Sequence, residues 1–271
     1  MPTTVRFLPN LDRISVLSAT ILLAYTLTGL IRVPARQFAA QLPGFYLEIQ
    51  VNIQTVVSLL VIALAVSGAD WLIDEQPAAQ GRSRFQHWLI PALTAWVIGI
   101  PLYQGSLGTY WWLGILAGGG ILMLVLTAEY VVADEQNPYY AVAAVGLTAV
   151  AFALFFLLAI TLRVIRLRLY LMVPALTLAT ALISLRTLSL RMQGRWLLLA
   201  SGVCAVIVGQ LGAAAQYLPF SPIAYGLFLL APAYGVTVFL SDLGLGKSRW
   251  TATIEFAALL FILWLLAWWS R

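Results

Sequence analysis

Long apolar stretches separated by short polar connections run through the whole chain. A helix needs about 20 mostly apolar residues to cross a bilayer, and only helices or closed barrels satisfy their backbone polar groups in lipid. The alternating ten-residue strands of a barrel are not evident. We therefore predict an all-α polytopic transmembrane helix bundle with about nine spans, in one membrane domain over residues 1–271. The predicted spans are residues 14–33, 48–68, 87–104, 109–132, 139–162, 169–185, 196–218, 222–240 and 250–269.

Two of these spans contain proline. The third is short and carries Pro91 and Pro101, and the sixth contains Pro174 with arginines at both ends. Both are kept as spans, with a partial re-entry of the sixth as the alternative. The first apolar run is longer than the roughly 7–15 residues of a signal-peptide core, which favours a retained span.

Composition supports lipid as the main solvent. Of 271 residues, 62% are hydrophobic and 9% are charged, whereas soluble domains carry roughly 25% charged residues. We expect an integral protein of a bacterial or archaeal cytoplasmic membrane, with the lipid bilayer as its partner. The formal net charge of +5 comes from basic residues that flank the spans. At these positions they are expected to contact lipid headgroups. No long basic face exists, so nucleic acid is not an expected partner.

The distribution of charge predicts an orientation. Nine of the 15 lysines and arginines fall on the face that holds the N-terminus and six on the other. The positive-inside rule then places the N-terminus in the cytoplasm. Nearly all the acids share the N-terminal face, and Glu48 alone lies opposite.

Two connections on that face resemble each other. Residues 69–77 and 128–138 both read small, acidic, aromatic and two aliphatics, followed by Asp-Glu-Gln and a proline. This similarity indicates a parallel two-helix repeat in the N-terminal half, an arrangement found in several transporter folds. The alternative is an acid-rich helix end that proline terminates, which requires no repeat.

The same acids are the candidate metal ligands. Carboxylates from two such clusters can hold Mg²⁺ against a diphosphate, and no other cofactor is predicted. For Glu129, which is close to a span end, a position at headgroup depth is the favoured alternative. The candidate ligands are Asp70, Asp74, Glu129, Asp134 and Glu135.

Nine spans and acidic motifs on one face make the chain similar to the intramembrane aromatic prenyltransferase superfamily. That resemblance implies a membrane enzyme acting on a prenyl diphosphate with Mg²⁺. The chain departs from the family at Val66, where the first motif has asparagine. It departs again after the sixth span, where the second motif is replaced by Arg186, Arg191 and Arg195.

Four polar residues are candidates for roles inside the membrane: Glu48, Asn52, Gln210 and Glu255. In a helix starting near residue 48, Glu48, Asn52 and Thr55 would share one face. Such groups either hydrogen-bond between helices or line a wet cavity. Glu255 lies about one turn into the last span, where it could also reach headgroups.

The chain has one histidine and one cysteine, which limits the disulfide, haem and metal sites that it can form. One cysteine, Cys204, excludes an intrachain disulfide, and it reads as a small apolar side chain. One histidine, His87, argues against bis-histidine haem ligation and a histidine-rich metal site. His87 begins a span beside Trp88, so we expect it at the membrane interface.

Small residues recur at helical spacing in two spans. Gly114 with Gly118, and Gly209 with Ala213, form small-xxx-small pairs that let helices approach closely. They could pack within the chain, against another membrane protein, or in a homo-oligomer.

Three classes of function stay open. A transporter, permease-like or lipid-handling protein fits a bundle with polar residues in its spans. A structural or assembly subunit fits the small-residue faces and the low interior charge. A membrane-embedded enzyme acting on a lipid-like or prenyl diphosphate substrate would use the acidic helix ends.

Overall fold

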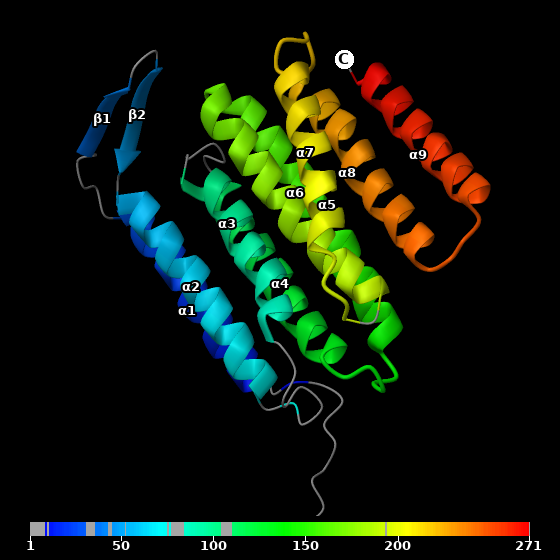
Figure 1. Cartoon of the computed structure of the whole chain (residues 1–271). Helices are drawn as coiled ribbons and strands as arrows, with labels where there is room; N and C mark the ends of the chain where they lie inside the picture. Colours follow the sequence, from blue (N-terminus) through cyan, green and yellow to red (C-terminus); the bar gives the residue numbers. More distant parts are fainter. Residues whose placement is uncertain are drawn as a thin grey trace, which may run out of the picture.

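In the computed structural model, the described part of the chain forms nine α-helices that pack into one bundle (Figure 1). The structure describes residues 9, 11–30, 36–42, 45–51, 53–74, 76, 84–103, 110–192 and 194–270. A two-stranded hairpin and a short 3₁₀ helix accompany the helices within these ranges. The elements are α1 (Leu11–Leu30), β1 (Arg36–Leu42), β2 (Phe45–Val51), α2 (Ile53–Asp74), η2 (Arg84–Trp88), α3 (Leu89–Tyr103), α4 (Trp111–Val132), α5 (Tyr140–Val164), α6 (Leu169–Arg191), α7 (Leu198–Ala215), α8 (Pro222–Gly244) and α9 (Arg249–Trp269).

Eight of the described helices are long and apolar enough to cross a bilayer. Their lengths and composition confirm the predicted helical bundle, including the two proline-containing spans. α1 is a ninth helix of 20 residues, at the position of the first predicted span. Helices with apolar residues on every side suit a protein surrounded by lipid, where the outer surface needs no polar stripe.

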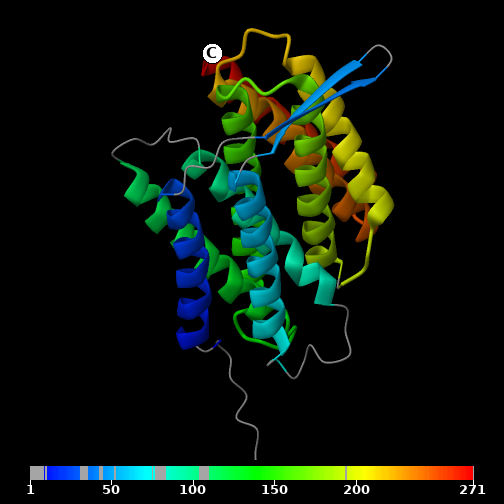
Figure 2. The ribbon, with the colours of Figure 1, turned by 90° about the vertical axis from the view of Figure 1, so that its left-hand side faces the viewer.

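The predicted second span begins too early. Residues 45–51 form β2, which pairs antiparallel with β1 from Arg36↔Val51 to Leu42↔Phe45. The segment Phe-Tyr-Leu-Glu-Ile-Gln-Val alternates apolar and polar residues, which is the period of a strand and not of a helix. The hairpin extends beyond α2 at the end of the bundle that also holds the C-terminus (Figures 1 and 2).

The sixth span is longer than predicted. α6 continues through Arg186 to Arg191, so these residues belong to a helix and not to a basic connection. Gly194 follows with a φ of 78°, and its N–H binds the Ser189 carbonyl at 2.8 Å. A glycine in this left-handed conformation is a common helix terminator.

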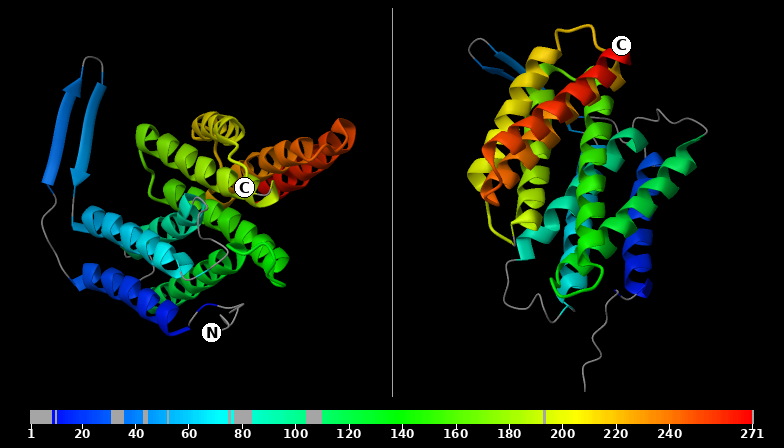
Figure 3. Two further views of the ribbon diagram at one scale, coloured as in Figure 1. Left: turned by 60° about the horizontal axis from the view of Figure 1, so that its bottom comes forward. Right: turned by 90° about the vertical axis from the view of Figure 1, so that its right-hand side faces the viewer.

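The core lies around α5, which packs against α3, α4, α6 and α8. Phe155 and Leu158 of α5, Leu176 of α6 and Tyr225 of α8 are fully buried there. α9 lies at the rim and packs mainly against α8 (Figure 3). It buries two residues, Ala252 and Ala267. The side of the bundle formed by α9 is therefore held mainly by contacts with α8.

Glycine allows two of the close helix contacts. A side chain at Gly118 would meet Ile98 of α3, and one at Gly209 would meet Thr177 of α6. Two of the four predicted small-residue positions are thus occupied by contacts within the chain. The parallel two-helix repeat stays a prediction.

Candidate functional site

A buried ion pair joins the ends of α4 and α6. The side chains of Glu129, in the last turn of α4, and Arg186, near the end of α6, are 1% and 3% exposed. Arg186 Nε donates to Glu129 Oε1 at 3.1 Å, and its Nη2 donates to Oε2. This two-point geometry is a strong arrangement for an arginine and a carboxylate. Protein therefore surrounds the Glu129 carboxylate, and its depth in the membrane stays a prediction.

His87 adds a third group to the pair. It belongs to η2, and its Nδ1 lies 2.8 Å from Glu129 Oε2 and 3.0 Å from Arg186 Nη2. The arginine can only donate, so the shorter contact favours a proton on Nδ1 that is donated to the carboxylate. The interface expectation for His87 is sharpened: the ring, 13% exposed, is bound to the buried ion pair.

Gln86 and Ser189 complete the environment of the arginine. Arg186 Nη1 donates to Gln86 Oε1 and to Ser189 Oγ, both at 3.5 Å. Gln86 Nε2 in turn donates to the Gly194 carbonyl at 3.1 Å. Each guanidinium nitrogen of Arg186 thus has an acceptor, which offsets the cost of burying a charge.

The turn η2 also contacts the other acidic helix end. Trp88 Nε1 donates to Asp70 Oδ1 at 3.2 Å. Asp70 and Glu129 occupy matching positions in the two similar connections, and neighbouring residues of η2 bind both. The turn therefore ties the ends of α2, α4 and α6 together at one end of the bundle.

The candidate magnesium ligands do not converge. Glu129 is paired with Arg186, Asp70 binds Trp88, and Asp134 accepts the Gln136 N–H at 3.0 Å inside its own turn. Asp74 and Glu135 are exposed. No three His, Cys, Asp or Glu side chains in the described part of the chain are placed to hold a metal. Among the described residues, the acidic motifs that supported the prenyltransferase resemblance therefore do not form a cluster of metal ligands.

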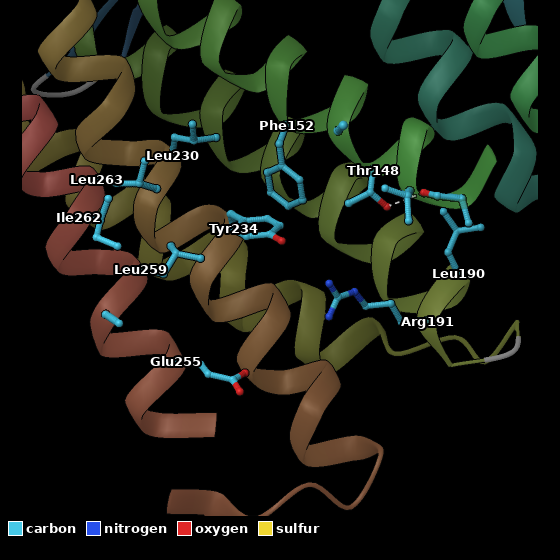
Figure 4. A pocket seen from close by; sticks show the side chains of 14 residues that line it. Thr148, Phe152, Leu190, Arg191, Leu230, Tyr234, Glu255, Leu259, Ile262 and Leu263 are labelled. Carbon is cyan, nitrogen blue, oxygen red and sulfur yellow. Dashed lines mark hydrogen bonds between the residues drawn. The ribbon is translucent and has the colours of Figure 1, made fainter. Parts of the chain in front are cut away.

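A groove opens between α5, α8 and α9, with the end of α6 at one side (Figure 4). Its volume is about 820 Å³. Phe152 and Tyr234 meet edge to face near its centre, with ring centroids 5.0 Å apart. The groove is apolar except for a few side chains. Its lining residues are Ala144, Val145, Thr148, Ala149, Phe152, Leu190, Arg191, Leu230, Tyr234, Glu255, Ala258, Leu259, Ile262 and Leu263.

Charged side chains gather at one end of the groove, which we call the mouth. Arg191 Nη1 donates to Ser241 Oγ at 3.0 Å and lies 3.8 Å from Asp242 Oδ1. Lys247 Nζ lies 3.5 Å from Asp242 Oδ2 and 2.5 Å from Glu255 Oε2. The hydrogen bond to Glu255 raises the pKa of the Lys247 ammonium, which keeps the lysine charged. The two cations and two anions balance.

The three predicted polar candidates that the structure describes lie on different elements. Glu255 lines the groove. Gln210 is exposed on α7 and is not part of the groove lining. Glu48 lies in β2, so the predicted helical face with Thr55 does not form. Asn52 lies outside the described residues.

Sequence reasoning missed Arg186 and Arg191 as site residues because it ended the sixth helix at residue 185. A signal was available. Nothing between residues 185 and 191 breaks a helix, and the first glycine after them is Gly194. Glycine as the stop signal would have kept both arginines in the helix.

The long apolar helices of the described bundle define the class: this is a multi-pass helical membrane protein. A family model matches residues 33–270, so the chain belongs to that family, which is described as protein of unknown function (DUF5656). No curated protein and no solved structure matches the chain.

Proposed function

We propose that this protein is a lipid-handling membrane protein that seats an acyl chain of a bilayer lipid in the groove between α5, α8 and α9. The observation that carries the proposal is the separation of charged and apolar side chains along the groove. Its charged residues, Arg191 and Glu255, are at one end, and leucine and isoleucine from α8 and α9 line the other (Figure 4). A membrane lipid has the same polarity, with one charged end and an apolar tail.

The depth of the groove supports this proposal. From Glu255 to Leu263, α9 advances eight residues, which at 1.5 Å per residue is about 12 Å. The hydrocarbon core of a bilayer is about 30 Å thick, so one leaflet is about 15 Å deep. An acyl chain whose headgroup is at the mouth would therefore fit within one leaflet.

The chemistry of the groove favours a lipid over a polar solute. A transporter for ions or sugars needs polar groups along its path, and here the path beyond Tyr234 is aliphatic. The peripheral position of α9 also gives a lipid direct access from the bilayer, because this wall packs mainly on α8. Both features fit lateral entry of an amphiphile.

The groove can be filled by one substitution. Ala258 lines it, and Ala258→Trp would place an indole where the acyl chain is proposed to lie. We expect the phospholipid that stays bound through detergent purification to fall several-fold, measured by native mass spectrometry and phosphate analysis. The neighbouring Ala257 is exposed and does not line the groove, so Ala257→Trp is the matched control.

The comparison of the two variants decides the proposal. Ala257→Trp should retain as much phospholipid as the unmodified protein, with an unchanged Tm in detergent. Equal retention by all three proteins would overturn the proposed function. A loss in both tryptophan variants would also count against it, since the effect would then be unrelated to the groove.

A further inference from the structure

The mouth of the groove presents two opposite charges from opposite sides. Arg191 reaches it from α6 and Glu255 from α9 (Figure 4). A headgroup at this position would have an arginine on one side and a carboxylate on the other. The charge on each side therefore bears on which headgroup fits.

Both groups keep hydrogen-bonding capacity for a ligand. Arg191 uses Nη1 for Ser241, and no bond to another residue of the described chain occupies its Nε or Nη2. Glu255 uses Oε2 for Lys247, which leaves Oε1 without a partner among the described residues. An anionic group can bind beside Arg191 and a cationic group beside Glu255 without displacing a buried contact.

The ion pair between Lys247 and Glu255 is no obstacle to a ligand cation. The two side chains are 39% and 55% exposed, and exposed ion pairs are weak because water screens them. A ligand ammonium could share the carboxylate with Lys247 or replace it at little cost. The balanced charge of the mouth would be kept in either case.

We propose that the mouth selects a zwitterionic phospholipid, with its phosphate on Arg191 and its ammonium group on Glu255. This inference rests on the proposed function. A headgroup with a phosphate alone would add a net negative charge to this balanced mouth, beside the Glu255 carboxylate, which disfavours it. A primary ammonium suits Glu255 best, since it donates hydrogen bonds that a quaternary ammonium lacks. The ligand class is therefore a phosphatidylethanolamine-type lipid.

The test compares phosphatidylethanolamine with phosphatidylglycerol of the same acyl chains. The delipidated full-length protein is titrated with each lipid in mixed detergent micelles, and binding is followed by native mass spectrometry. The unmodified protein should prefer phosphatidylethanolamine. Glu255→Gln should reduce that preference by about threefold to tenfold, as expected for the loss of one ordinary hydrogen bond at an exposed site, and Glu255→Lys should reverse it.

Two further variants separate the roles of the charges. Arg191→Gln should weaken both lipids alike, because both carry a phosphate. Glu135→Gln removes an exposed carboxylate outside the groove, between α4 and α5, and should change neither affinity. Native mobility of each variant checks that it remains folded.

The outcomes distinguish the two proposals. Equal binding of the two lipids to the unmodified protein, or an unchanged preference in Glu255→Gln, overturns the headgroup assignment. If Ala258→Trp still lowers total lipid retention, the groove proposal stands without it. If Ala258→Trp has no effect, the proposed function fails, whatever the headgroup preference.

Discussion

Arg186 can remain charged inside the bundle because all its guanidinium nitrogens have acceptors. The pair with Glu129 is nevertheless no simple source of stability, since both ions lost their water on burial. Removing one partner leaves a buried charge without compensation. Replacing both by apolar side chains of similar volume removes the cost of dehydrating the two charges together with their attraction.

This reasoning predicts non-additive effects at Glu129 and Arg186. Glu129→Leu and Arg186→Met should each lower the free energy of unfolding by about 3–5 kcal/mol. The double variant should lose clearly less than the two single losses combined. Reversible unfolding in mixed micelles measures all four corners of the cycle. Additive losses would mean that the two side chains do not depend on each other.

The sequence placed Glu129 on the correct helix but could not supply its partner. Arg186 lies 57 residues away, and hydropathy assigns a basic residue near a span end to the interface by default. Burial of the pair depends on α4 and α6 meeting at η2, which is a tertiary contact. The groove residue Glu255 was selected because an acid inside a span is rare, and that signal needs no partner.

At the scale of elements, Arg163 connects the end of α5 to the turn between α7 and α8. Its Nη1 donates to the Gln216 carbonyl at 3.0 Å and to Gln216 Oε1 at 2.6 Å, and its Nη2 donates to the Leu218 carbonyl at 2.9 Å. The guanidinium also lies over the Tyr225 ring, 5.3 Å from its centroid. One side chain thus satisfies carbonyls that the end of α7 leaves open.

Loss of this arginine should loosen the turn locally. Arg163→Gln is expected to lower the free energy of unfolding by about 1–3 kcal/mol, because charged hydrogen bonds to carbonyls are lost. Proteolysis near Tyr217 should accelerate. Arg166 is exposed a few residues further on, so Arg166→Gln serves as the control. Unchanged cleavage near Tyr217 in Arg163→Gln would show that the turn is held by other contacts.

The elements were predictable where hydropathy alone decides them. α4, α5, α8 and α9 begin and end within about four residues of the predicted spans. The hairpin was missed because residues 45–51 lie directly before an apolar helix, and a search for long apolar runs joins the two. The alternation of residues in that segment was the available signal, and it is a local one.

At the scale of the whole molecule, orientation in the membrane stays a prediction. The positive-inside rule places the N-terminal face, with the turn after α4, in the cytoplasm. In a Cys204→Ser background, Tyr217→Cys should then react in intact cells with a maleimide that cannot cross the membrane. Glu135→Cys should react only after the cells are opened. The reverse pattern would invert the orientation.

The position of the buried ion pair has a consequence for how the protein is made. Glu129 is three residues from the end of its helix and Arg186 five, so each helix can enter the bilayer alone with its charged group still hydrated. Insertion of each helix then does not require the ion pair. Removal of water from Glu129 and Arg186 does require it. Biogenesis would proceed in two stages, with independent insertion first and a later, cooperative closure around η2 that quality-control proteases could sense.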